Sequence, residues 1–180
     1  IHALDRSGMN FIVSHSFSKI FSLYGERVGS LSFVCDDANI AQNVLGQLKA
    51  TVRRIYSSPA ANGALLVSQV LNDTALSQLW QSELEEMRQR ILQMRRLLED
   101  KLSQALPDMD FSYLTQQQGM FSYTGLSAEQ VDLLKQDYGI YLVRSGRMCT
   151  AGLNLNNIDY VAKSMATVLK AASSAESMLA

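Results

Sequence analysis

The sequence is poor in the residues that mark disulfide-rich, metal-binding or disordered proteins. Of its 180 residues, two are cysteine, two are histidine and two are proline. Cys35 and Cys149 belong to no C-x-x-C pair, so the sequence predicts neither a disulfide framework nor a zinc site. We expect both thiols to be free, buried and reduced, as in the cytoplasm. The few prolines and ten glycines also argue against a collagen-like or disordered chain.

An excess of charge of one sign is also missing. Sixteen basic residues face seventeen acidic ones, so the sequence predicts no surface for nucleic acid or an anionic membrane. No run of eighteen apolar residues is present, which argues against a membrane span. Apolar residues still make up 47% of the chain, enough for the core of one domain or parts of two. The chain starts without Met and without the pattern of a signal peptide, so we expect a truncated cytoplasmic protein.

Short apolar runs alternate with helical patterns along most of the chain. Strands are expected at 11–13, 31–35, 120–123, 140–143 and 147–150, the first of them buried, and helices at 38–56, 63–71, 127–138 and from 157 onward. Ser127 and Gln130 have the spacing of a capping box at the start of one helix. This alternation predicts an α/β fold.

The longest pattern predicts one helix over about 74–106. Its apolar positions recur every three or four residues, Asn72 or Asp73 can cap its start, and Pro107 ends it. Such a helix is on the order of 50 Å long. Because this exceeds the width of one small domain, we expect it to bridge two lobes. A coiled coil is the alternative, but it requires a stricter spacing of 3.5 residues.

Ser16-Phe17-Ser18-Lys19 is the segment richest in chemistry. Taken alone, it is most simply a strand end followed by a solvated lysine. An S-x-x-K serine hydrolase, with Ser16 as nucleophile, would also need S-D-N and K-T-G strings, and the chain has neither. A Schiff-base lysine, the second alternative, needs a group that holds the phosphate of an aldehyde cofactor. Arg27, eight positions after Lys19, could supply that group.

From Ser14 to Gly29 the chain reads S-H-S-F-S-K-I-F-S-L-Y-G-E-R-V-G. This string resembles the pyridoxal-phosphate lysine motif of fold-type I aminotransferases, in the aspartate and aromatic amino-acid aminotransferase family. Residues 50–59, 118–126 and 145–154 are similar to three further motifs of that family, in the same order. The resemblance is closest to the bacterial aromatic-amino-acid (tyrosine) branch, and aspartate aminotransferase stays a second possibility.

The resemblance implies the C-terminal part of the PLP-dependent transferase fold. Residues 1–86 would be the end of the large mixed-sheet α/β domain that binds the cofactor. Residues 87–180 would be the α+β small domain, and the long helix would join the two. In this fold Lys19 would form an imine with pyridoxal 5'-phosphate and then act as general acid and base. Ser16 and Arg27 would bind the cofactor's phosphate.

The resemblance also implies three substrate-binding residues. Arg147 would clamp the substrate α-carboxylate with two parallel hydrogen bonds, with Phe121 beside it. Arg53 would bind the distal carboxylate of acidic substrates from the neighbouring subunit of a homodimer, with Arg54 as the alternative one position along. His15, Ile55 and Ala60 depart from residues common in the family. Of these, Ile55 and Ala60 flank the shared-site arginine and therefore put substrate preference in question.

The implied reaction is transfer of amino groups between aromatic or acidic L-amino acids and 2-oxo acids such as 2-oxoglutarate, by a ping-pong mechanism. In the family, the aspartate that holds the pyridine nitrogen and the aromatic residue that stacks on the ring lie upstream of the lysine. The resemblance implies that the parent protein is an enzyme. Because no such motifs precede Lys19, we expect this chain alone to be inactive. The alternative is a folded, non-catalytic module that keeps the family's architecture.

Overall fold

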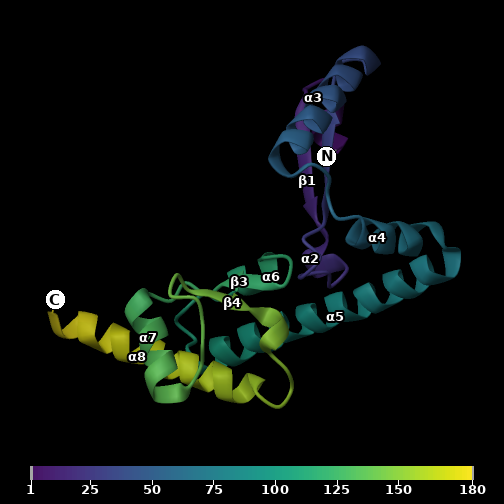
Figure 1. Cartoon of the computed structure of the whole chain (residues 1–180). Helices are drawn as coiled ribbons and strands as arrows, with labels where there is room; N and C mark the ends of the chain where they lie inside the picture. The colour runs from purple at the N-terminus through teal and green to yellow at the C-terminus, as the bar shows by residue number, and fades with distance from the viewer. Residues whose placement is uncertain (1, 180) are drawn as a thin grey trace. The chain divides into compact units, whose positions relative to one another are not determined.

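The computed structural model describes the backbone of residues 2–179 and their side chains except those of residues 2, 5 and 172–179. The chain divides into two compact units, Ile1–Leu84 and Glu85–Ala180. Figure 1 follows the elements from purple at the N-terminus to yellow at the C-terminus. Among the described residues, no helix combines the length and the apolar character needed to cross a bilayer.

The first unit contains one antiparallel pair of strands. After α1 (His2–Arg6), β1 (Phe11–Ser16) pairs with β2 (Gly29–Val34) in a register that runs from Phe11 opposite Val34 to Ser16 opposite Gly29. The short helix α2 (Phe17–Ile20) lies in the loop between them. Helices α3 (Ala38–Tyr56) and α4 (Asn62–Asn72) follow. The Asp37 carboxylate caps α3 by accepting hydrogen bonds from the backbone N–H groups of Asn39 and Ile40.

Little of this first unit is buried. Its only buried residues among those described are Ser18, Gly63 and Val67. The expected burial of the first strand is therefore wrong, since Ile12 is 61% exposed. The physical reason is that a two-stranded sheet has two faces, and without further layers it cannot bury them.

The predicted long helix is present as α5 (Thr74–Ala105). The Asp73 carboxylate accepts a hydrogen bond from the Leu76 backbone N–H at 3.0 Å and so caps its first turn. The helix ends two residues before Pro107. Its first turns belong to the first unit and the remainder to the second.

The second unit has a well-defined core. Its elements are α6 (Tyr113–Gln116), β3 (Phe121–Tyr123), α7 (Ala128–Tyr138), β4 (Arg147–Cys149), the 3-10 helix η1 (Thr150–Gly152) and α8 (Ile158–Leu179). Strands β3 and β4 form a second antiparallel pair. The centre of the core is made by apolar side chains from α5, α6, α7 and α8, including Met94, Leu98, Leu114, Leu134 and Met165.

Two expectations for this unit are wrong. Residues 140–143 form no strand, because after the left-handed turn at Gly139 the segment pairs with no neighbouring strand among the described residues. Its one ladder-like contact is the hydrogen bond from the Val143 N–H to the Arg147 carbonyl. The thiol of Cys149 is free but exposed, since Cys149 alternates along β4 with the buried Met148.

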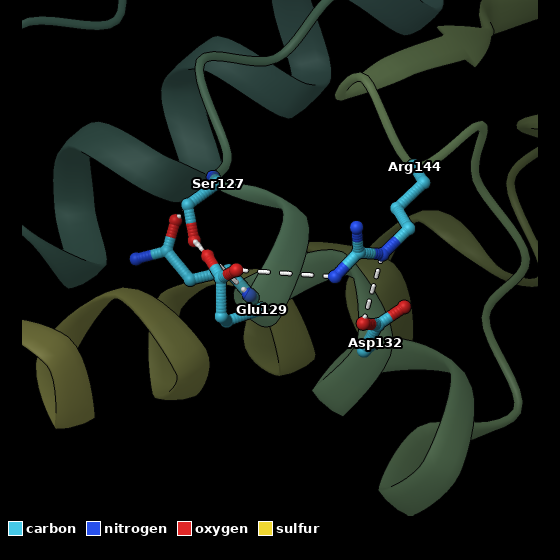
Figure 2. A network of polar contacts seen from close by, with 5 residues as sticks. Ser127, Glu129, Asp132 and Arg144 are labelled. Atoms are coloured by element: carbon cyan, nitrogen blue, oxygen red, sulfur yellow. Dashed lines mark hydrogen bonds and ion pairs between the residues drawn. The ribbon is translucent and has the colours of Figure 1, made fainter.

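The predicted capping box at α7 is present, and Figure 2 shows the polar network around it. Gln130 donates its backbone N–H to the Ser127 hydroxyl, while the Gln130 side chain accepts from the Ser127 N–H. Arg144 then contacts the same turn, with Nε 3.0 Å from Asp132 Oδ2 and Nη2 3.9 Å from Glu129 Oε1. The loop that precedes β4 is thereby tied to the start of α7.

Candidate functional site

The segment that carries Lys19 is a closed loop, residues 16–28, which we call the lysine loop. Its two ends meet where Ser16 pairs with Gly29 and the Phe17 N–H donates to the Val28 carbonyl at 3.1 Å. The Ser16 hydroxyl caps α2: it accepts from the Ser18 N–H at 3.3 Å and lies 3.1 Å from the Ser18 hydroxyl. Ser18 is buried and Lys19 is exposed. A side chain at Gly29 would place its Cβ 2.3 Å from the His15 carbonyl oxygen, so the closure requires glycine.

Within this loop, Lys19 and Arg27 converge on Tyr24. The Lys19 Nζ lies 5.3 Å from the centre of the Tyr24 ring, and Arg27 Nη1 donates to the Tyr24 carbonyl at 3.0 Å. Neither cation has a carboxylate partner within the described part of the chain. An amine and a guanidinium are thus held around one residue with their charges unpaired, which suits a ligand that carries both an aldehyde and a phosphate.

The backbone is strained near the predicted cofactor and substrate residues. Three described residues other than glycine have positive φ: Ser22 (+55°), Arg27 (+52°) and Ser57 (+71°). The first two lie in the lysine loop, and the third contacts Arg53. A left-handed conformation costs a residue with a side chain on the order of 1–3 kcal/mol, and such strain concentrates at functional sites.

Trp80, on α5, holds the end of α2. Its indole N–H donates to the Ile20 carbonyl at 3.0 Å, and its ring stacks on Phe21 with centroids 4.7 Å apart and planes 7° from parallel. Phe21 in turn contacts Phe17 edge to face. Sequence reasoning counted Trp80 only as an apolar position of the long helix. The available signal was its indole N–H, because a packed tryptophan usually needs an acceptor.

Arg53 and its neighbour Arg54 are both exposed in the last turn of α3. Arg53 Nη1 donates to the Ser57 hydroxyl at 2.8 Å, and this bond fixes the side chain at the helix end. Within the described residues, the Arg54 side chain makes no hydrogen bond or ion pair. The two arginine side chains therefore differ in their contacts within the chain.

In the second unit, the other two predicted substrate residues lie together. The guanidinium carbon of Arg147 is 5.0 Å from the centre of the Phe121 ring. In the β3–β4 pair, Tyr123 is opposite Arg147, and the buried residues Ser122 and Met148 occupy the other face. Arg147 and Phe121 are therefore presented on the exposed face, as a cation above an aromatic ring.

Gly146 fixes the start of β4. It has a φ of +83°, and a Cβ added there would lie 2.9 Å from the Leu126 carbonyl oxygen. Its own carbonyl accepts from both the backbone N–H and the hydroxyl of Thr124, at 2.9 and 2.7 Å. These two hydrogen bonds from Thr124, in the loop after β3, set the position at which Arg147 enters the strand.

The predicted residues are thus divided between the two units. Ser16, Lys19, Arg27 and Arg53 belong to the first, and Phe121 and Arg147 belong to the second. An open groove in the second unit is lined by α5 side chains between Glu86 and Leu97 and includes none of the six. No cluster of three or more metal-ligating side chains occurs among the residues described.

Comparisons with known proteins extend these observations. Residues 2–165 match the family described as aminotransferase class I and II. The chain is 59% identical over 169 residues to the aromatic-amino-acid aminotransferase of Escherichia coli strain K12, in an alignment that covers 94% of this chain and 43% of that protein.

Two solved structures are similar in fold. The aromatic amino-acid aminotransferase of Psychrobacter sp. B6, cocrystallised with aspartic acid, superposes with a TM-score of 0.90 at 50% identity and covers 93% of this chain and 42% of its own. The aromatic-amino-acid aminotransferase of Burkholderia pseudomallei, covalently bound to pyridoxal phosphate, gives 0.86 at 48% identity, with coverages of 92% and 41%.

The chain thus spans less than half the length of these relatives. The predicted fold class is confirmed, since the mixed α/β chain matches the C-terminal portion of the fold-type I aminotransferase structures. With a family match over most of its length, this chain belongs to the class I and II aminotransferases.

Proposed function

We propose that this chain is the lysine-bearing part of a pyridoxal-phosphate aminotransferase that acts on aromatic or acidic L-amino acids and 2-oxo acids such as 2-oxoglutarate. The observation that carries the proposal is the convergence of Lys19 and Arg27 on Tyr24 inside a closed, strained loop. The family match and the resemblance to a relative bound covalently to pyridoxal phosphate support it.

At the cofactor end, the residues of the lysine loop have separate tasks. Pyridoxal phosphate, when bound, supplies an aldehyde and an electron-withdrawing ring. Lys19 provides the amine that attaches it, and Arg27 grips the phosphate with its planar guanidinium. Ser16 holds the helix start through its bond to Ser18 and offers its hydroxyl to the same phosphate. With substrate bound, the Lys19 amine would act as general base and then general acid: it would take the proton from the substrate Cα and deliver it to the cofactor carbon that carried the aldehyde.

At the substrate end, Arg147 binds the α-carboxylate. The Phe121 ring beneath it keeps the guanidinium in place without neutralising its charge, so two parallel N–H groups stay available for a carboxylate. Because every α-amino acid has this carboxylate, Arg147 binds without selecting a side chain.

Arg53 adds selection for acidic substrates. Its exposed position at the end of α3 and its anchor on Ser57 suit a guanidinium that reaches a distal carboxylate in the neighbouring subunit of a homodimer. Within this proposal, the unit up to residue 84 is the end of the large cofactor-binding domain, and the unit from residue 85 is the small domain. The free thiols of Cys35 and Cys149 support a cytoplasmic location.

The alternative function is a folded module that keeps the architecture without catalysis. The test is to add pyridoxal phosphate to the chain and record its near-ultraviolet and visible spectrum. The proposal expects a lysine-linked absorbance band that borohydride fixes, with the reduced adduct mapped by mass spectrometry to Lys19. The band is expected to vanish in Lys19→Ala and to persist in Lys49→Ala, which removes an exposed lysine of α3. An unchanged spectrum, or an adduct spread over several lysines, would favour the alternative.

A further inference from the structure

Arg95 is a buried cation without a charged partner. It lies on α5 in the second unit, is 1% exposed and stands in the helix between the core residues Met94 and Leu98. No carboxylate pairs with it within the described residues, and its Nε has no hydrogen-bond acceptor. Burial lowers the pKa of its guanidinium. Packing alone does not explain a charge in this core, because an apolar side chain would fill the space without the free-energy cost of desolvating a charge.

The four hydrogen bonds of Arg95 all go to one short segment. Nη1 donates to the Leu114 carbonyl at 2.7 Å and to the Ser122 hydroxyl at 3.0 Å. Nη2 donates to the Gly119 carbonyl at 2.9 Å and to the Phe121 carbonyl at 2.7 Å. These acceptors lie in α6, in the loop after it and in the first two residues of β3. One planar group therefore fixes the path of the chain into β3, which the compact ammonium of a lysine could not do.

On the face of β3 opposite the buried Ser122, the Phe121 side chain contacts Arg147 of β4. Arg95 contacts the backbone of Phe121 and, on the buried face, the side chain of Ser122. On the exposed face, the Phe121 ring lies under the Arg147 guanidinium. Because side chains alternate between the faces of a strand, a shift or twist of β3 at its start would move the Phe121 ring away from Arg147.

Apart from the Thr150 N–H, which donates to the Met120 carbonyl at 2.8 Å, a second set of side-chain bonds holds β3 downstream of that point. The Gln117 side chain accepts from the Tyr123 N–H at 2.7 Å and donates to the Tyr123 carbonyl at 3.0 Å. It also accepts from the Ser122 hydroxyl at 3.1 Å. The Phe121 carbonyl is bonded by Arg95 and by no other side chain among the described residues. Arg95 is therefore the one described side chain that restrains the Phe121 backbone directly, in addition to the pairing of β3 with β4.

We propose that Arg95 is a positioning residue for the carboxylate clamp: it holds the start of β3 from inside the core, so that the Phe121 ring orients Arg147. The inference rests on the proposed function for what Arg147 binds, but the geometry it claims can be tested without any substrate. A purely structural Arg95 would change the stability of the unit and leave the Phe121–Arg147 contact intact whenever the chain is folded.

The experiment measures that contact directly in the full 180-residue chain. In an NMR spectrum with labelled arginine side chains, the Phe121 ring shifts the Arg147 Hδ and Nε–H resonances upfield, and Phe121→Leu defines the total shift. Arg95→Lys and Arg95→Met are expected to lose at least half of it while circular dichroism still reports a folded chain. The matched control is Arg90→Lys, on the same helix, because Arg90 also donates to two carbonyls, those of Leu153 and Ala151, but to nothing in residues 114–122.

A full Phe121–Arg147 shift in folded Arg95 variants would overturn the proposal. If both Arg95 variants fail to fold, Ser122→Ala decides, since it removes one acceptor and little volume: a partial loss supports positioning, and an unchanged shift contradicts it. Titration with succinate then separates the two proposals. Weaker binding by about two- to fivefold in the Arg95 variants is expected if the ring contact aids carboxylate binding. If succinate causes no shift of the Arg147 resonances in the wild-type chain, this result would count against the proposed function. The ring-shift comparison would still decide the role of Arg95.

Discussion

The indole of Trp80 stacks parallel to the ring of Phe21, with the ring centroids 4.7 Å apart. Phe21 is two residues after Lys19. The same indole donates its N–H to the Ile20 carbonyl, so both the side chain and the backbone that follow Lys19 are held from α5. A residue 60 positions away in sequence thus limits how far the end of α2 can move. The proposed attachment of a cofactor at Lys19 would depend on that restraint.

Trp80→Phe is expected to weaken the attachment of pyridoxal phosphate to Lys19. Phenylalanine can keep the stack on Phe21 but cannot donate to the Ile20 carbonyl, which costs about 1 kcal/mol of stability. The yield of the borohydride-reduced Lys19 adduct is expected to fall in parallel. The control is Trp80 emission in the wild-type chain: Trp80 is the single tryptophan, so quenching by bound cofactor reports on this site. Equal adduct yields in wild type and Trp80→Phe would show that the restraint is irrelevant to attachment.

The two units are expected to differ in local stability. The core side chains from Met94 to Val168 lie in the second unit, whereas Val67 is the one buried large apolar residue among those described in the first. Because local stability follows buried apolar contacts, backbone amides of β1, β2 and α3 are expected to exchange with solvent faster than those of α7 and of α5 beyond Met94. Hydrogen–deuterium exchange with mass spectrometry measures this. Equal protection of β2 and α7 in the isolated chain would contradict it.

The sequence predicted best those features whose determinants are adjacent in the chain. The capping box at Ser127 and the cap of the long helix at Asp73 are examples, because every group that defines them lies within a few residues. Features fixed by distant partners escaped prediction. The apolar residues 140–143 resemble a strand but pair with no neighbouring strand in the part of the chain that the structure describes. Arg95 stands in a charged stretch of α5, and only the acceptors contributed by residues 114–122 explain its burial.

Gly146→Ala is expected to destabilise the second unit and to displace Arg147. The matched control is Gly139→Ala: both glycines have positive φ, but a Cβ at Gly139 meets nothing within 4 Å, whereas one at Gly146 lies 2.9 Å from a carbonyl oxygen. Alanine in a left-handed conformation costs about 1–2 kcal/mol, which both variants share. Urea unfolding is expected to show a larger loss for Gly146→Ala, accompanied by a reduced Phe121 ring shift at Arg147. Equal losses for the two variants would show that the close approach to Leu126 is unimportant.

Arg53→Ala and Arg54→Ala are expected to separate the two neighbouring arginines by substrate. In an assembly with transaminase activity to which this chain contributes Lys19, Arg53→Ala should lower kcat/KM for L-aspartate by about ten- to a hundredfold, the worth of one charged hydrogen bond. The loss for L-phenylalanine should be small, because its side chain has no carboxylate. Arg54→Ala serves as the control, because Arg54 makes no bond to Ser57. This variant should leave kcat/KM for both substrates nearly unchanged. Arg147→Lys should instead reduce activity toward both, since the α-carboxylate is common to them. Equal losses for aspartate and phenylalanine in Arg53→Ala would remove the role proposed for this residue, and a selective loss in Arg54→Ala would transfer that role to its neighbour.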